Sequence, residues 1–289
     1  MLGRNHVSIS LATIMPFLIP LIFLESNNSI IYGFAFLISI LVGSLLPDAD
    51  CGGKSKLYYD FNIFYQLIIP ITKLTVWTFK LSSVKKKLST KFSELQDVNH
   101  EHRGIMHSPI GTIVSSFLLT LIILIIMTLI AKTNLLLVLI IFLGLIIGQI
   151  LHLLEDSCTV TGINWMFPFG KKELKGQIYT FEWKYQNKKD IRPMIYVYSL
   201  VAVSIISLLV NSFGAVNNLF LYYLITTIAV LIIWIIIIKI SQSQSIFWYR
   251  DAEKIKQIQK KQRKALKKFT GIKRKKHKKR SYKHFKSRY

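Results

Sequence analysis

Three histidines occur within eight residues in the segment HEHRGIMHS, at positions 100, 102 and 107, beside Glu101 and Arg103. The whole chain has only seven histidines. Imidazole and carboxylate groups are common metal ligands, and a guanidinium binds phosphate through two parallel hydrogen bonds. The segment therefore points to metal or phosphate chemistry.

Three other polar segments lie at the edges of apolar runs: GRNHVS with His6, LLPDAD with Asp48 and Asp50, and LHLLEDSCTVTG with His152 and Asp156. His152 and Asp156 are four residues apart, so on a helix they share one face and can bind one ion. Asp48 and Asp50 follow a proline. Their carboxylates can point the same way there, as alternate residues of an extended segment do.

His102 and His107 are five residues apart, so an unbroken helix would place them on different faces. Gly104 permits a turn between them, so that both could face one centre. Mixed imidazole and carboxylate ligands favour zinc, with manganese or iron as alternatives, over calcium or copper(I). Such a metal activates water for the hydrolysis of an ester at neutral pH.

Long apolar runs separate the polar segments and must position them. The runs are residues 8–24, 30–46, 110–131, 134–153, 195–213 and 219–238. A helix of about 17–25 residues, rising about 1.5 Å per residue, crosses the roughly 30 Å of a bilayer core. The chain is 52% hydrophobic with a mean hydropathy of +0.41 and a net charge of +24. We therefore predict an all-α polytopic membrane protein with about six transmembrane helices rather than a soluble globule.

A further apolar segment, residues 63–81, contains Gln66, Pro70, Lys73 and Lys80. Charges and a proline within one run predict an interfacial helix that lies on the membrane surface instead of crossing it.

Lysine and arginine set the predicted orientation. The connectors after the first, third and fifth runs hold a single basic residue, Lys132, whereas the other connectors are rich in lysine. The positive-inside rule then places both termini and the basic connectors in the cytoplasm, so we predict a multi-pass protein of the cell membrane. The same topology brings all four polar segments to the cytoplasmic face. The predicted domains are a helical membrane domain at 1–245, with a cytoplasmic loop at 51–109, and a tail at 246–289.

The polar segments resemble the YdjM-like family of inner-membrane metal-dependent hydrolases, which are LexA-regulated in some bacteria. The matching pieces are His6 ahead of the first run, LLPDAD, HRGIMHS and HLLEDSCTVTGINWMFPF, which are spread over residues 6–169. The resemblance implies a multi-span helical hydrolase with a divalent metal at the cytoplasmic face.

A weaker similarity is to the all-helical zinc phospholipase C and nuclease group, in which histidine and aspartate four residues apart on a helix hold a metal cluster. The metal ligands implied in this way are His6, Asp48, Asp50, His102, His107, His152 and Asp156. Asp48 and Asp50 are alternatives for one position, as are His102 and His107. His6 would serve a second ion that shares Asp156.

The reaction implied by these resemblances is phosphoester hydrolysis on a phospholipid or a polyprenyl phosphate that reaches the site from the bilayer. Asp48, Asp156 and Arg103 are the candidate catalytic residues. Arg103 and Ser108 would contact the phosphate.

The tail is strongly basic. From Arg250 to Tyr289 there are 19 lysines and arginines against two acids. Each basic residue near an anionic leaflet contributes about 1 kcal/mol at most. Anionic lipid headgroups are therefore the expected partner, and nucleic acid is the alternative, because Tyr282 and Phe285 are interleaved with the charges.

Two other functions compete with the hydrolase. The first is a nonenzymatic membrane anchor, with a structural metal or polar cluster and a tail that binds nucleic acid or anionic lipid. The second, a transporter, is disfavoured because its ionisable groups should lie near the bilayer midplane, whereas these groups lie at one end of their helices.

Overall fold

The computed structural model describes residues 3–22, 27–54, 62–81, 104–130, 134–167, 172–179, 190–213 and 218–247. The chain divides into two units, Met1–Ile246 and Phe247–Tyr289, and every helix among the described residues belongs to the first. Nearly all of the predicted tail, residues 248–289, lies outside the described residues.

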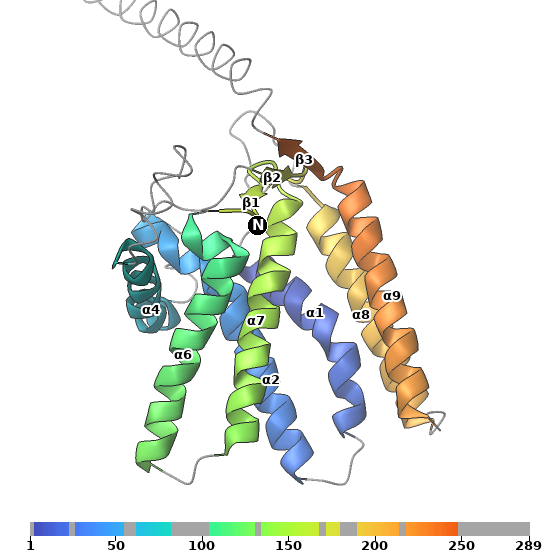
Figure 1. The fold of residues 1–289 in the computed structure, drawn as a ribbon. Helices are drawn as coiled ribbons and strands as arrows, with labels where there is room; N and C mark the ends of the chain where they lie inside the picture. Colours follow the sequence, from blue (N-terminus) through green and yellow to red (C-terminus); the bar gives the residue numbers. More distant parts are fainter. Residues whose placement is uncertain are drawn as a thin grey trace, which may run out of the picture. The chain divides into compact units, whose positions relative to one another are not determined.

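Each apolar run of the sequence forms one helix, and one more helix lies between the second and third runs (Figure 1). The helices are α1 (Gly3–Ile22), α2 (Asn27–Leu45), α4 (Asn62–Leu81), α6 (Pro109–Ile130), α7 (Leu135–Ser157), α8 (Arg192–Ser212) and α9 (Leu219–Ile240). Two 3-10 helices, η1 (Pro47–Lys54) and η2 (Ile105–His107), precede α4 and α6. Three short strands complete the described elements: β1 (Ile163–Asn164), β2 (Lys172–Lys175) and β3 (Gln244–Phe247).

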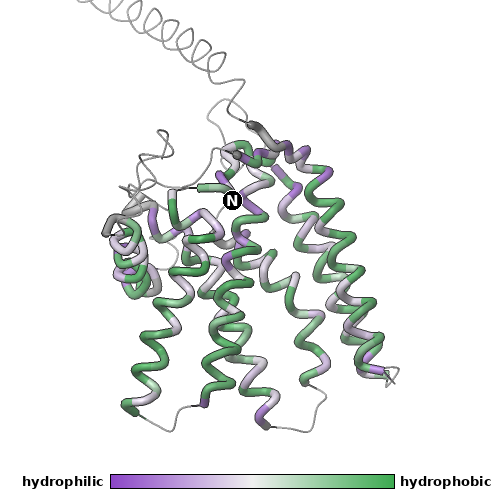
Figure 2. The backbone as a smooth tube through the Cα atoms, viewed as in Figure 1, coloured by the Kyte–Doolittle hydropathy of each residue, from purple (hydrophilic) through white to green (hydrophobic). Residues whose placement is uncertain are grey.

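Five helices are long and apolar enough to cross a membrane: α2 extended to Asp50, α6, α7, α8 and α9. A shorter apolar stretch, Asn5–Leu21, belongs to α1. Most residues of these helices are apolar along the length of each helix (Figure 2). Large apolar side chains such as Ile235 are about half exposed. A bilayer would cover such side chains. The predicted all-α polytopic membrane fold is confirmed.

Helices α2 and α7 pack with their backbones in contact because glycines lie at their interface. A Cβ atom on Gly43 would overlap the carbonyl oxygen of Leu145, and one on Gly148 would overlap that of Ile40. Small residues let membrane helices approach this closely. The contact places the last turns of α7 beside the end of α2.

Helix α1 is joined to α9 by a hydrogen bond to a backbone carbonyl of α1 that lacks its usual amide donor. Pro20 has no amide hydrogen, so the carbonyl of Pro16 one turn earlier lacks its helical donor. The Tyr222 hydroxyl of α9 donates to this carbonyl oxygen at 2.6 Å. The bond satisfies a polar group that would otherwise be costly within a membrane.

Gln149 joins α7 to α6 through a buried polar network. Its side-chain oxygen accepts from the Ser115 hydroxyl at 2.9 Å, and its amide nitrogen donates to the Ser116 hydroxyl at 2.7 Å. Interhelical hydrogen bonds of this kind hold membrane helices in register. Thus α6, which follows the HRGIMHS segment, is fixed against α7.

Helix α4 covers the connectors η1 and η2. Tyr65 and Val76 of α4 pack in one buried cluster with Leu46 and Met106, which flank the two aspartates and His107. The opposite face of α4 exposes Leu67 and other apolar side chains. The predicted helix is therefore present, and its interfacial placement stays a prediction.

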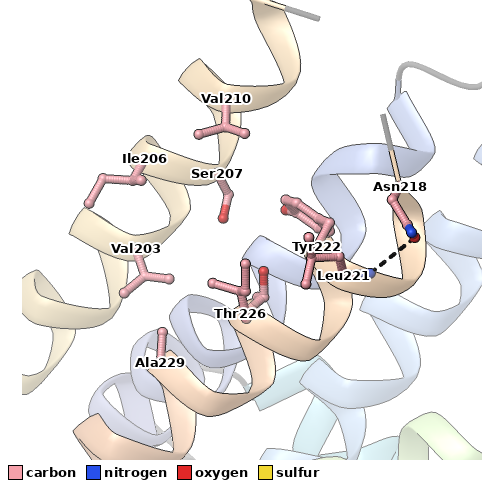
Figure 3. Close-up of a pocket in the computed structure, with 10 residues that line it drawn as sticks. Val203, Ile206, Ser207, Val210, Asn218, Leu221, Tyr222, Thr226 and Ala229 are labelled. Carbon is pink, nitrogen blue, oxygen red and sulfur yellow. Dashed lines mark hydrogen bonds between the residues drawn. The ribbon is translucent and has the colours of Figure 1, made fainter. Parts of the chain in front are cut away.

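A cavity of about 510 Å³ lies between α8 and α9 (Figure 3). Its walls are mainly apolar, with hydroxyl groups from Ser207, Tyr222 and Thr226. Among the described residues, no acid, histidine or basic side chain lines this cavity, so they do not supply the groups that acid–base or metal chemistry needs.

Candidate metal centre

Four helix ends meet at one end of the bundle (Figure 1). His6 lies near the start of α1, Asp48 in η1 after α2, His107 in η2 before α6, and His152 and Asp156 in the last turns of α7. The three histidines are fully buried, with 0% of their surface exposed.

One ring nitrogen of His152 is hydrogen-bonded to a backbone carbonyl, and the other faces two carboxylates. Its Nδ1 lies 2.7 Å from the carbonyl oxygen of Ser44, which can only accept, so Nδ1 carries the proton and donates it. Nε2 is then an acceptor. It lies 3.7 Å from Asp48 Oδ1 and 3.8 Å from Asp156 Oδ2. Three buried acceptors facing one another are unfavourable unless positive charge lies close to them.

His107 presents Nε2 to the same two carboxylates, at 3.6 Å from Asp48 Oδ1 and 3.7 Å from Asp156 Oδ2. Its other nitrogen, Nδ1, lies 3.4 Å from Asp50 Oδ2. Burial lowers the pKa of His107, but Asp50 and Asp48 outweigh burial and raise this pKa to about 9. The carboxylates therefore make positive charge favourable at this point.

The prediction that Asp48 and Asp50 point the same way from an extended segment is wrong. The chain leaves α2 as the 3-10 helix η1, which has about three residues per turn, so side chains two positions apart diverge. Asp48 accordingly faces Nε2 of His107, and Asp50 faces Nδ1 on the other side of the ring. The two acids have different positions instead of competing for one.

Four possible ligand atoms lie close together: Nε2 of His107, Nε2 of His152, Oδ1 of Asp48 and Oδ2 of Asp156. Each nitrogen lies 3.6 to 3.8 Å from each oxygen. Ligands bound at about 2.0–2.2 Å around a tetrahedral ion are roughly 3.3–3.6 Å apart. The nitrogen–oxygen separations are only a few tenths of an ångström longer than this. Within the set, His107, His152 and Asp156 form one buried group that could hold a metal ion, and Asp48 forms another with His6 and His152.

His6 lies on the opposite side of Asp156. Its Nε2 is 3.6 Å from Asp156 Oδ1, whereas Oδ2 of the same carboxylate faces His107 and His152. The His6 ring stacks on His152 with centroids 3.9 Å apart. His6, Asp48 and His152 also bring ligand atoms close enough to hold an ion together. Asp156 therefore presents one oxygen to His6 and the other to His107 and His152.

The chain matches the YdjM inner membrane protein family over residues 1–243, a range that contains every described helix. The chain belongs to this family. The predicted resemblance to YdjM-like proteins is thereby confirmed, as is a membrane location. No curated protein and no solved structure matches the chain.

In this YdjM family member, the structure brings most of the predicted ligands together. Those whose donor atoms face the centre are His6, Asp48, His107, His152 and Asp156. Asp50 lies behind His107. Two predicted site residues, His102 and Arg103, lie outside the described residues.

Ser108 has a local structural role, contrary to its predicted contact with phosphate. Its hydroxyl donates to the Ile105 carbonyl at 2.7 Å and accepts from the Gly111 amide at 3.1 Å. Ser108 is fully buried. The side chain therefore joins η2 to the first turn of α6 and fixes the position of His107.

Two groups at the centre were not predicted from the sequence: the Ser44 carbonyl and the Glu155 carboxylate. No pattern of residue types reveals a backbone carbonyl that caps a histidine from another helix. Glu155, in contrast, is an ionisable residue within a helix of membrane-spanning length. Such residues are costly there unless they are paired, and this signal would have been sufficient to find it.

Proposed function

We propose that this protein is a membrane-bound divalent-metal-dependent hydrolase that acts on a phosphoester of a lipid or lipid-linked substrate. The observation that carries the proposal is the arrangement around His152. Its Nε2 and two carboxylate oxygens are buried acceptors that face one another at 3.7 and 3.8 Å, with Nε2 of His107 closing the set.

The residues that would hold the ion are Asp48, His107, His152 and Asp156, with His6 at the second position. Imidazole and carboxylate ligands suit zinc, with manganese and iron as alternatives. When bound, such an ion supplies Lewis acidity, which activates water and polarises a phosphoester oxygen.

The chain's own groups would orient the ligands and accept a proton. The Ser44 carbonyl and Asp50 lie behind Nδ1 of His152 and His107 and direct their Nε2 atoms inward. The Asp48 side chain is 13% exposed, against 1% for Asp156. Asp48 is therefore the better placed of the two to accept a proton from an attacking water and release it to solvent.

The membrane placement of the centre favours a substrate that is itself a lipid. The centre lies at the ends of helices of membrane-spanning length, so a phosphate headgroup could reach it while the acyl or polyprenyl chain stays in the bilayer. Arg103 is the proposed phosphate contact. The distribution of lysine and arginine supports a cytoplasmic orientation for this end, and the basic tail would bind anionic headgroups.

The burial of the centre favours one competing function. All three histidines are 0% exposed, and structural metal sites are closed whereas catalytic sites keep an open position. A nonenzymatic membrane anchor with a structural ion is therefore the second candidate.

The test is metal content and turnover of the full-length protein purified in detergent. We expect bound zinc, manganese or iron, and hydrolysis of phosphatidic acid or a polyprenyl phosphate. His152→Ala and Asp156→Ala should lose both, while Glu173→Gln, in β2 where Glu173 pairs with Lys175, should lose neither. Undiminished metal content in His152→Ala and Asp156→Ala would refute the site. Bound metal without turnover of either substrate would favour the anchor.

A further inference from the structure

Glu155 is a buried acid next to Asp156 that is not among the proposed metal ligands. It is 1% exposed. Its Oε2 lies 2.7 Å from His6 Nδ1, and its Oε1 accepts a hydrogen bond from the Ser10 hydroxyl at 3.3 Å. His6 and Ser10 are one turn apart on α1, so a single face of α1 contacts both carboxylate oxygens of Glu155.

His6 therefore has an acid on each side of its ring. Nδ1 faces Glu155, and Nε2 lies 3.6 Å from Asp156 Oδ1 at the centre. The 2.7 Å separation is an ion-pair contact between two buried atoms, and a small rotation of the His6 ring would align Nδ1–H with Oε2, since neither atom has a hydrogen-bond partner in the present ring orientation. Metal-binding histidines commonly donate their second N–H group to a carboxylate or a carbonyl, which fixes the tautomer and the ring orientation.

The other two histidines follow the same pattern. Behind Nδ1 of His152 is the Ser44 carbonyl at 2.7 Å, and behind Nδ1 of His107 is Asp50 at 3.4 Å. In all three rings Nε2 lies near Asp48 or Asp156, and an oxygen acceptor lies within 2.7 to 3.4 Å of Nδ1. The contact of His152 is a hydrogen bond. The repetition across three separate helix ends indicates that the acceptor behind His6 serves the centre.

We propose that Glu155 is a positioning residue that accepts the Nδ1 proton of His6 and so directs His6 Nε2 into the metal centre. Ser10 holds the second carboxylate oxygen and sets the orientation of the acid. The inference rests on the proposed function, since it requires an ion at the centre. It explains why α7 carries two consecutive acids: Asp156 faces the metal position, and Glu155 faces the histidine that contributes from α1.

The test measures binding of Co²⁺ to the metal-free full-length protein, followed by visible absorption and by stoichiometry. Glu155→Ala should weaken the His6-dependent part of binding about 10- to 100-fold. Glu155→Gln should weaken it less, because the amide oxygen still accepts from His6. Ser10→Ala should have a smaller effect in the same direction. Glu173→Gln is the matched control and should bind as the wild type does.

A double-mutant cycle separates positioning from an independent role. If Glu155 acts through His6, the variant with both His6→Ala and Glu155→Ala should bind Co²⁺ as His6→Ala alone does. Additive losses would overturn the proposal, as would unchanged binding in Glu155→Ala. Equal and complete loss of the ion in Glu155→Gln and Glu155→Ala would also overturn it, because that result identifies a direct ligand.

The same titration distinguishes failure of the inference from failure of the proposed function. If the wild type binds Co²⁺ in a His152-dependent way and the Glu155 variants bind it equally well, only the inference about Glu155 is contradicted. If the wild type binds no Co²⁺, both the metal centre and the inference about Glu155 are contradicted.

Discussion

The Nδ1 atom of His152 lies 2.7 Å from the carbonyl oxygen of Ser44. Ser44 is in the last turn of α2, where carbonyl groups have no amide partner within the helix. A side chain of α7 thus supplies the missing donor. This one contact joins the two helices and decides which nitrogen of His152 faces Asp48 and Asp156.

The first prediction concerns that nitrogen. In the metal-free protein, ¹⁵N NMR of histidine-labelled chain should show His152 protonated on Nδ1 and not on Nε2, because the carbonyl can only accept. Addition of Zn²⁺ should shift the Nε2 signal and leave the Nδ1 proton in place. The signal is assigned by its loss in His152→Gln. A proton on Nε2 would contradict the proposed donor set.

The second prediction concerns the glycine contact between α2 and α7. Gly148→Ala puts a methyl group against the backbone of Ile40, so the helices must separate, at a cost of about 1–3 kcal/mol. We expect a lower unfolding temperature and weaker metal binding, since α2 and α7 both contribute ligands. Gly33→Ala is the control, because its nearest neighbour would be a flexible Leu21 side-chain atom at 3.4 Å. Equal stability of the two variants would show that the contact is not tight.

The third prediction concerns the hydrogen bond from Tyr222 to the Pro16 carbonyl in α1. Tyr222→Phe removes the donor to the Pro16 carbonyl and should lower the free energy of unfolding by about 1 kcal/mol. Metal binding should be unchanged, because the bond is remote from the ligands. Tyr223→Phe removes a hydroxyl from the adjacent residue and should have a smaller effect. Thermal unfolding in detergent measures both, and a larger loss for Tyr223→Phe would contradict the assignment.

The fourth prediction concerns pH and Asp190, which precedes α8. Burial raises the pKa of Asp190, but hydrogen bonds from the Arg192 guanidinium and from the backbone amides of Arg192 and Tyr179 outweigh it and lower this pKa. A lowered pKa in the folded state stabilises the protein above the unfolded value of about 3.9, and the contribution is lost as the pH falls through the folded value.

Asp190→Asn should therefore destabilise the protein at pH 7, by less than about 1 kcal/mol because the pair is partly exposed. The difference from wild type should shrink as the pH is lowered below 4. Unfolding temperatures measured across this range check the sign. A difference that grows on acidification would contradict it.

The sequence determined the helices and the chemical character of the centre. Apolar runs such as 134–153 form helices because an uninterrupted stretch of such residues satisfies its backbone internally and excludes water. The spacing of His152 and Asp156 was also sufficient, since four residues on a helix always place two side chains on one face. These are local properties, and each depends on the chain within a few residues.

The tertiary structure decided the role of each polar group. Asp48 and Asp50 are indistinguishable in the sequence, and only the 3-10 turn after α2 places them on different sides of His107. Glu155 acquired partners only because α1 lies against α7. Contacts between residues nearly 150 positions apart depend on how helices pack, and packing is set by many weak interactions summed over whole faces. No short segment of sequence contains that sum.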